Sequence, residues 1–344
     1  MQSSGWIVGP RYDTLFFTAS LAVPMAMWAA FAHGLMTGVA VYVAFQLLFN
    51  LPHNFQTWTM SVLDEDDRAK NGRTYVVAAI VTLLVFGVPM IVSPDGVYPW
   101  VRDALIYWGY YHLVRQHYGF QRMYERKLGG VTDRESFWYG RYLDAVSYLP
   151  LLIRFRDPDL MTIQAGPARS WIHHPVLPAP AVTAVIALYA AVIAAAVVHH
   201  VVAYAKGRRG LLPRALLLAS VTICFGLAAV VISDLIVAIA IVTAFHNLQY
   251  LGLVLFHNRN RAAQGDTRGN VPIAWLAGGR AALYAAVSLF YGIALFAPRA
   301  LFQTTKLGEL PIAFVVAMHY FVDARVWKFK DYPKRGVWLL LKKA

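Results

Sequence analysis

Long apolar stretches separated by short polar segments dominate the sequence. Most run for about 20 residues, the length that an α-helix needs to cross the hydrocarbon core of a bilayer. The pattern predicts ten membrane-crossing helices, at about 13–33, 37–60, 74–92, 100–121, 136–153, 180–203, 213–231, 235–256, 281–298 and 310–327. No internal repeat and no soluble segment interrupts them. We therefore predict an all-α fold, a polytopic helical bundle that forms a single domain over residues 1–344.

Composition supports this class of protein. Hydrophobic residues make up 58% of the chain and charged residues 14%, whereas soluble domains carry about 25% charged residues. The only cysteine is Cys224, which excludes disulfides within the chain and metal sites built from several thiolates. The sequence thus predicts a multi-pass integral membrane protein, and we expect it in a bacterial inner membrane.

The basic residues predict an orientation, because Lys and Arg accumulate in cytoplasmic loops. With ten spans and a cytoplasmic N-terminus, the cytoplasmic side holds 22 of the 31 Lys and Arg residues. The opposite side holds six, and three more lie within spans. Both termini are therefore predicted to be cytoplasmic. The net charge of +13 then reflects membrane orientation, and we expect no nucleic-acid partner.

One predicted span contains an unusual number of polar side chains. The segment 107–127, YWGYYHLVRQHYGFQRMYERK, places histidine, arginine and glutamine among aromatic residues. These polar residues are His112, Arg115, Gln116, His117 and Gln121. Polar groups within a membrane span are costly and usually face the interior of the bundle, so they indicate a functional site.

Four histidines are predicted to share one depth in the membrane. His53, His112, His246 and His319 lie in the second, fourth, eighth and tenth spans, which all cross in the same direction. Counted from the cytoplasmic ends of their spans, they differ by three residues, or about 5 Å at the helical rise. Four helices would thus deliver imidazoles to one plane, as in the metal sites of helical bundles.

Spacing along each helix refines this set. His319 and Asp323 are one helical turn apart and share a face. His112 and His117 are five residues apart, about 140° around a regular helix, and can share one metal only if the helix contains a π-bulge. Otherwise Gln116 is the closer partner of His112.

A further histidine is predicted to lie away from this plane. His257 lies eleven residues after His246, about 16 Å along the helix, so the two cannot bind the same ion. We expect His257 at the rim of the site or beside an anionic lipid headgroup.

Imidazoles with one or two carboxylates and no thiolate suit Fe, Zn, Mn or Cu(II), and a histidine–carboxylate set with open positions favours Fe(II) and dioxygen. The predicted metal ligands are His53, His112, His117, His246 and His319, and the predicted catalytic residues are Asp323, Tyr250 and Arg115. The surrounding aromatic residues suit a lipid-like, isoprenoid or carotenoid-type substrate. The sequence therefore predicts a non-haem metal oxygenase or related oxidoreductase.

Known metal-binding motifs are mostly absent: there is no HExxH and no histidine-box set of the membrane desaturases. In arrangement, through His53, His112, His246 and His319, the chain resembles the Brp/Blh-type bacterial β-carotene dioxygenases. These proteins are polytopic and poor in cysteine, and isolated histidines from several spans hold one iron. The resemblance implies an iron-dependent membrane dioxygenase.

Two other functions remain open from the sequence. A proton-coupled transporter could use the same intramembrane His, Asp and Arg groups. A haem-binding electron-transfer subunit could use histidine pairs across helices. A simpler interpretation needs no cofactor, since a single intramembrane histidine commonly donates or accepts a hydrogen bond between helices.

Overall fold

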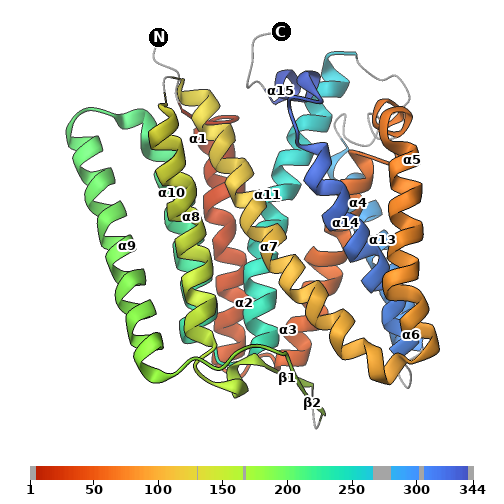
Figure 1. Ribbon diagram of the computed structural model, residues 1–344. Coiled ribbons are helices and arrows are strands. Elements are labelled where there is room, and N and C mark those ends of the chain that lie inside the picture. Colours follow the sequence, from red (N-terminus) through yellow and green to blue (C-terminus); the bar gives the residue numbers. More distant parts are fainter. Residues whose placement is uncertain (1–4, 130, 166–167, 266–279, 302–305, 340–344) are drawn as a thin grey trace. The chain divides into compact units, whose positions relative to one another are not determined.

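The computed structural model describes residues 5–129, 131–165, 168–265, 280–301 and 306–339. Within these residues the regular structure is helical apart from one short hairpin (Figure 1), which confirms the all-α prediction. Contacts divide the chain into two compact units. Unit 1 contains residues 1–42 and 113–249, and unit 2 contains residues 43–112 and 250–344.

Three helices contribute residues to both units. They are α3 (Gly38–Phe45), α7 (Pro94–Leu128) and α11 (Leu235–Ala263). His112 lies in the part of α7 that belongs to unit 2, and His117 lies in the part that belongs to unit 1. On α11, unit 1 ends at Gln249 and unit 2 resumes at Tyr250.

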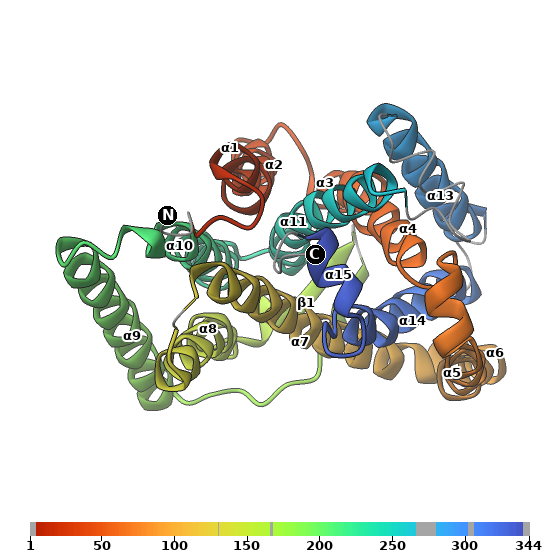
Figure 2. The ribbon, with the colours of Figure 1, turned by 90° about the horizontal axis from the view of Figure 1, so that it is seen from above.

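Unit 1 is built from helices that lie side by side, with the hairpin at one end (Figure 1). Besides its shares of the three helices above, its elements are α1 (Pro10–Asp13), α2 (Ala22–Ala32), α8 (Asp133–Arg154), β1 (Thr162–Ala165), β2 (Ala168–Trp171), α9 (Ala179–Ala205) and α10 (Leu212–Gly226). The strands pair antiparallel, with Thr162 opposite Trp171. Helix α8 packs against both α9 and α10 (Figure 2).

Unit 2 is also built from helices that pack against one another. Its own elements are α4 (Leu51–Thr59), α5 (Glu65–Thr82), α6 (Val88–Val92), α13 (Ala281–Leu301), α14 (Leu310–Val326) and α15 (Pro333–Trp338). Helix α4 packs against α13 on one side and against α14 on the other, and α14 also contacts α5 (Figure 2).

Among the described residues, seven helical stretches are long and apolar enough to cross a membrane. They are Pro10–Ala32, Glu65–Val92, Ala179–Ala205, Leu212–Val231, Leu235–Ala263, Ala282–Arg299 and Leu307–Val326. Each overlaps one of the predicted spans. The other three predicted spans are helical too, in α3–α4, α7 and α8, but they are more polar. The chain is thus a helical protein with the properties of an integral membrane protein, and the count of ten remains a prediction.

Two prolines explain two irregular turns. Proline lacks an N–H, and its ring clashes with the carbonyl four residues earlier in a regular α-helix. A π-helical turn, Gln46–Asn50, immediately precedes α4 and Pro52, and another, Leu83–Gly87, immediately precedes α6 and Pro89. The wider turns relieve both clashes. The Asn54 side chain then donates to the Asn50 carbonyl at 2.9 Å.

Polar side chains also hydrogen-bond to the carbonyls of the two π-helical turns in unit 1. In one of them, Thr14–Thr18, Gln249 Nε2 donates to the Phe17 carbonyl at 2.8 Å. At the other, Leu227–Val231, the guanidinium of Arg154 donates to the Ala228 and Ile232 carbonyls at 2.9 and 2.6 Å. Unpaired backbone groups are expensive in an apolar interior, so these side chains stabilise the irregular turns.

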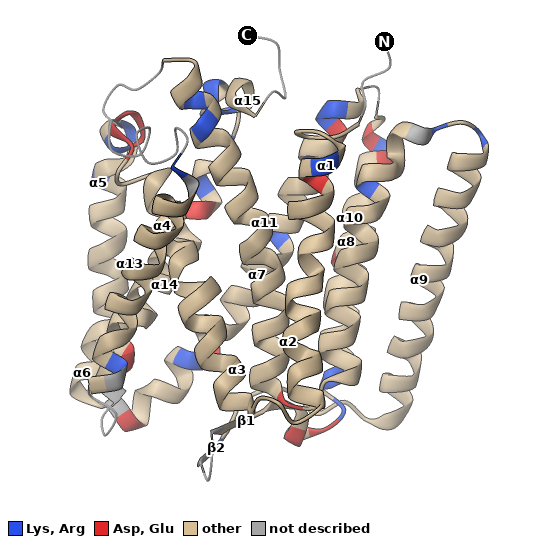
Figure 3. Ribbon diagram, turned by 180° about the vertical axis from the view of Figure 1, so that it is seen from behind, with Lys and Arg blue, Asp and Glu red and all other residues tan. Residues whose placement is uncertain are grey.

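In each unit, charged residues gather near the helix ends and the middle stretches are mostly uncharged (Figure 3). Unit 2 joins three segments that are predicted to lie on the cytoplasmic side. Arg261 pairs with Asp64, Lys70 donates to the Asp331 carbonyl at 2.8 Å, and Arg335 lies 3.3 Å from Asp67.

In unit 1, too, the polar contacts join segments that are predicted to lie on the same side of the membrane. Arg208 pairs with Glu135 at 3.1 Å, which joins two segments predicted to be cytoplasmic. Arg154 donates to the Ser233 carbonyl at 2.7 Å, which joins two segments predicted to lie on the opposite side. Within α8, Arg141 pairs with Asp144, three residues later, at 2.7 Å.

These contacts lead to a labelling prediction. The only native cysteine, Cys224, is buried, so single cysteines can be introduced at exposed positions. We expect Asp95→Cys and Arg156→Cys to react with a membrane-impermeant maleimide in intact cells. Ala69→Cys and Lys334→Cys should react only after the cells are permeabilised, because the basic side faces the cytoplasm. Labelling of positions 69 and 95 from the same side would contradict the topology.

Candidate metal centre

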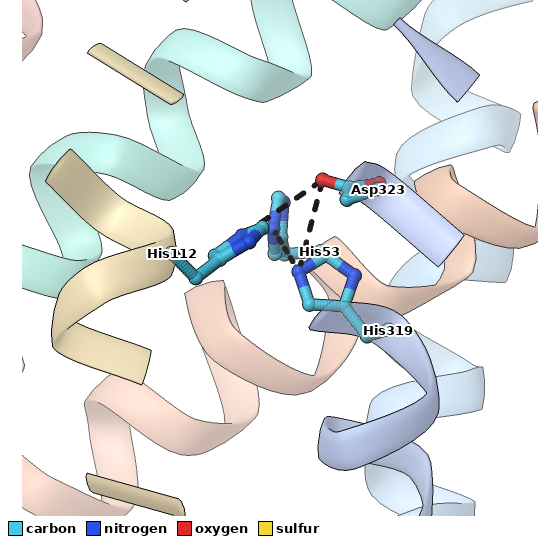
Figure 4. Close-up of side chains that lie close together, drawn as sticks. All are labelled: His53, His112, His319 and Asp323. Carbon is cyan, nitrogen blue, oxygen red and sulfur yellow. Dashed lines mark hydrogen bonds and ion pairs between the residues drawn. The ribbon is translucent and has the colours of Figure 1, made fainter. Parts of the chain in front are cut away.

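Unit 2 brings three histidines and one aspartate together. His53 comes from α4, His112 from α7, and His319 and Asp323 from α14 (Figure 4). One ligand atom from each of the four lies within 4.8 Å of the others, and all four residues are buried. A group of this kind can hold a metal ion.

The backbone brings His112 close to α14. On α7, Gly109 precedes His112 by three residues and so lies on nearly the same face. A Cβ at Gly109 would approach the Tyr320 hydroxyl to 2.5 Å, so a larger residue there would displace this tyrosine. The Tyr320 ring in turn packs on His112, with ring centres 4.8 Å apart.

Asp323 is the centre of a buried hydrogen-bond network. Its Oδ1 atom accepts hydrogen bonds from the Thr57 hydroxyl at 2.8 Å and from the Tyr250 hydroxyl at 2.7 Å. Trp327 Nε1 donates to the Tyr250 oxygen at 3.3 Å. These bonds fix the orientation of the carboxylate and direct its other oxygen, Oδ2, towards the imidazoles.

The network also determines which nitrogen of His319 carries the proton. Thr57 has one hydroxyl hydrogen, and an ionised carboxylate can only accept, so Thr57 donates to Asp323. Its oxygen lies 2.8 Å from His319 Nδ1 and must accept from that nitrogen. His319 Nε2 therefore presents a lone pair, and it lies 3.1 Å from His53 Nε2.

Asp323 Oδ2 completes the arrangement. It lies 3.9 Å from His112 Nε2 and 3.9 Å from His319 Nε2. The carboxylate faces the imidazoles with one oxygen and is held by Thr57 and Tyr250 through the other. Metal sites commonly use this division of roles, in which hydrogen-bonded partners orient the ligands.

Arg335 fixes the two helices that carry most of these residues. Its guanidinium donates to the Met60 carbonyl at 2.8 Å, just after α4, and to the carbonyl of Val326, the last residue of α14. The final carbonyls of a helix have no partner within the helix. One buried side chain thus caps the C-terminal ends of both helices and sets their spacing.

The structure brings together five of the eight predicted site residues. His53, His112, His319 and Asp323 form the group, and Tyr250 binds its carboxylate. The predicted shared face of His319 and Asp323 is confirmed. His117, His246 and Arg115 belong to unit 1, and among the described residues no group of possible metal ligands includes His117 or His246.

Regular helix geometry explains why His117 is not in the group. Sharing a metal with His112 required a π-bulge, and α7 is a continuous α-helix from Pro94 to Leu128. The two side chains therefore point about 140° apart. The His117 ring instead faces His246, with ring centres 6.1 Å apart. Arg115 is exposed and stacks on Tyr118 at 4.4 Å.

His257 lies in a different setting from the predicted one. We expected it at the rim of the site or beside a lipid headgroup, but it is fully buried in unit 2. Its ring packs edge-on against Trp338 and Trp327, with centres 5.0 and 6.0 Å apart.

Sequence reasoning missed two residues, Thr57 and Trp327. Thr57 follows His53 by one helical turn, which was a usable signal because residues four apart share a face.

Comparison of the chain with models of known protein families, with curated proteins and with solved structures finds no match. The interpretation of the site therefore depends on its own geometry and chemistry.

The network predicts the effect of removing the Thr57 hydroxyl. Thr57→Val keeps a β-branched side chain of similar size but deletes the hydrogen bonds to Asp323 and His319. We expect metal affinity at the site to fall by about 10–100-fold, as is typical when an orienting partner is lost. Titration of the purified protein against a chelator of known affinity measures this change.

Thr59→Val is the matched control. Thr59 is also buried on α4, but its hydroxyl donates to the Gln56 carbonyl and does not contact the group. Equal losses in the two variants would show that Thr57 acts only through packing.

Proposed function

We propose that this protein is a membrane-embedded, metal-dependent oxygenase that holds non-haem Fe(II) and acts on a lipid-like, apolar substrate. The observation that carries the proposal is the convergence of His53, His112, His319 and Asp323 from three helices of unit 2. The proposal keeps three of the five predicted metal ligands and assigns Asp323 as the fourth ligand.

The spacing of the closest ligand atoms is compatible with a shared metal ion. With metal–nitrogen distances of about 2.0–2.1 Å, two ligands at right angles lie about 3 Å apart and two ligands at the tetrahedral angle about 3.4 Å apart. His53 Nε2 and His319 Nε2 are separated by 3.1 Å. Asp323 Oδ2 lies 3.9 Å from His319 Nε2, the nitrogen that keeps its lone pair when Nδ1 donates to Thr57.

The donor set narrows the choice of metal. Three imidazoles and one carboxylate, without a thiolate, suit Fe, Zn, Mn or Cu(II), and oxygenases use such sets with Fe(II) when coordination positions stay open. Four protein ligands leave two positions of an octahedron for other groups. Bound there, Fe(II) would supply the redox chemistry that dioxygen requires.

The chain's own residues have separate tasks in this proposal. Thr57 and Tyr250 hold the Asp323 carboxylate and leave Oδ2 to the metal. Tyr320 packs on His112 and limits the rotation of its ring. Burial of all four ligands excludes bulk water, which strengthens each electrostatic interaction in the site.

The substrate class follows from the setting of the site. His319 and Asp323 lie in Leu307–Val326, one of the stretches that is apolar and long enough to cross a membrane. A compound that reaches such a site from the lipid phase must itself be largely apolar.

The geometry favours the oxygenase over a haem protein. Two axial histidines of a haem lie on opposite sides of the iron, about 4 Å apart from nitrogen to nitrogen at similar bond lengths. The 3.1 Å between His53 and His319 is too short for that arrangement. No described contact specifically favours the transporter.

Metal analysis tests the proposal. We expect the protein purified in detergent to contain iron, to lack a Soret band and to consume dioxygen when an apolar lipid extract is added. His319→Ala removes a ligand, so it should lower the metal content by one equivalent per chain and abolish this consumption. Asp323→Asn should reduce both quantities.

His33→Ala is the control, because His33 is exposed on unit 1 and should retain full metal content. A folded His319→Ala protein with unchanged metal content would show that the cluster is only a hydrogen-bonded contact between helices. Metal loss without any lipid-dependent consumption of dioxygen would keep the metal site and reject the oxygenase.

A further inference from the structure

A second buried polar cluster lies in unit 1, where α7 faces α11. Its members are His117 and Gln121 on α7, and His246 and Gln249 on α11. Residues 117 and 121 are one turn apart, and so are residues 246 and 249, so each pair shares a face. The His117 and His246 rings lie 6.1 Å apart, and Gln249 lies beside the His117 ring.

The hydrogen bonds of His117 fix its tautomer. Its Nδ1 lies 2.8 Å from the Leu113 carbonyl, which can only accept, so Nδ1 carries the proton. The lone pair is therefore on Nε2, which has no hydrogen-bond partner among the described residues. Metal-binding histidines commonly donate their other N–H to a backbone carbonyl in this way. Aromatic rings hold the imidazole in place, with Phe245 stacked on it at 5.7 Å.

The two glutamines add further acceptors. Gln249 donates its Nε2 to the Phe17 carbonyl at 2.8 Å, and Gln121 donates its Nε2 to Glu125 at 2.9 Å. Each amide orientation is thereby fixed, so the remaining atom of each amide is an oxygen acceptor. Neither Oε1 atom has a hydrogen-bond partner in the part of the chain that the structure describes.

His117 Nε2 and the two glutamine oxygens are thus three acceptors in a buried apolar setting. Unpaired buried polar atoms are costly, and a cation with its water ligands would satisfy all three. Two imidazoles that share an ion at about 2.0–2.1 Å have ring centres on the order of 5–6 Å apart, which is close to the observed separation. Imidazole nitrogen binds Cu and Zn most strongly among the common divalent ions.

We propose that unit 1 carries a second metal site, in which His117 and His246 bind a zinc or copper ion and the Gln121 and Gln249 oxygens accept hydrogen bonds from its water ligands. This site is independent of the proposed oxygenase centre. It uses only residues of unit 1, and the two histidines do not depend on Asp323 or Arg335.

Zinc stoichiometry tests the second site. The purified protein, stripped with a chelator and titrated with Zn²⁺, should bind two equivalents per chain. The double variant His117→Ala/His246→Ala should bind one, and so should His319→Ala. Gln249→Leu should keep two equivalents but weaken one of them by about 10–100-fold, because it removes an orienting group.

The matched control is His199→Ala/His200→Ala. These two histidines also belong to unit 1, with ring centres 5.4 Å apart, but both contact the Tyr139 hydroxyl at 3.2 Å. This variant should still bind two equivalents.

The possible outcomes separate the two sites. A single equivalent in the unmodified protein that disappears in His319→Ala would overturn the second site and leave a hydrated polar pocket in its place. A single equivalent that disappears only in His117→Ala/His246→Ala would support the second site and reject the first. The unmodified protein and His319→Ala keep both unit 1 histidines, so the test does not depend on the folding of the double variant.

Discussion

Burial of the Asp323 carboxylate is the constraint on which unit 2 depends. An ionised group removed from water costs several kcal/mol unless charges and hydrogen bonds compensate it. Thr57 and Tyr250 supply two hydrogen bonds to one oxygen, and His112 and His319 face the other. The same bonds select the tautomer of His319. A positive ion between the imidazoles and the carboxylate would complete this compensation, and the group could hold a metal ion there.

The surrounding helices are arranged to make that burial possible. Pro52 accounts for the wide turn just before His53, and the Asn54 side chain donates a hydrogen bond to the carbonyl of Asn50, the last residue of that turn. Arg335 caps the ends of α4 and α14, and Asp64 and Asp67 lie 3.9 and 3.3 Å from its guanidinium. Irregular backbone within an apolar interior is tolerated when polar side chains satisfy it. The buried polar and charged side chains of unit 2 therefore stabilise its irregular turns and helix ends.

Hydrophobic periodicity was sufficient to predict the helices. Helix direction grouped four histidines, of which the structure brings His53, His112 and His319 together, whereas His246 belongs to unit 1. Both predictions depend on the lengths of the apolar segments and on the positions of the charged residues, which can be read directly from the sequence. The failure at His117 has a local cause, because five residues on a regular helix turn a side chain away. Thr57 could have been found, because it shares a helix face with His53, but Trp327 and Arg335 were beyond prediction because their roles depend on tertiary contacts between segments far apart in the chain. The two-unit division and the burial of His257 depend on such contacts too.

X-ray absorption at the metal edge tests the central claim most directly, since it reports the atoms around the ion. The sample is the metal-loaded His117→Ala/His246→Ala protein, so that only the unit 2 centre contributes. The account predicts nitrogen and oxygen neighbours alone, with the multiple-scattering pattern of three imidazoles. In Asp323→Asn the shell of oxygen neighbours should change while the imidazole pattern remains. A sulfur neighbour, or a spectrum with no imidazole contribution, would contradict it.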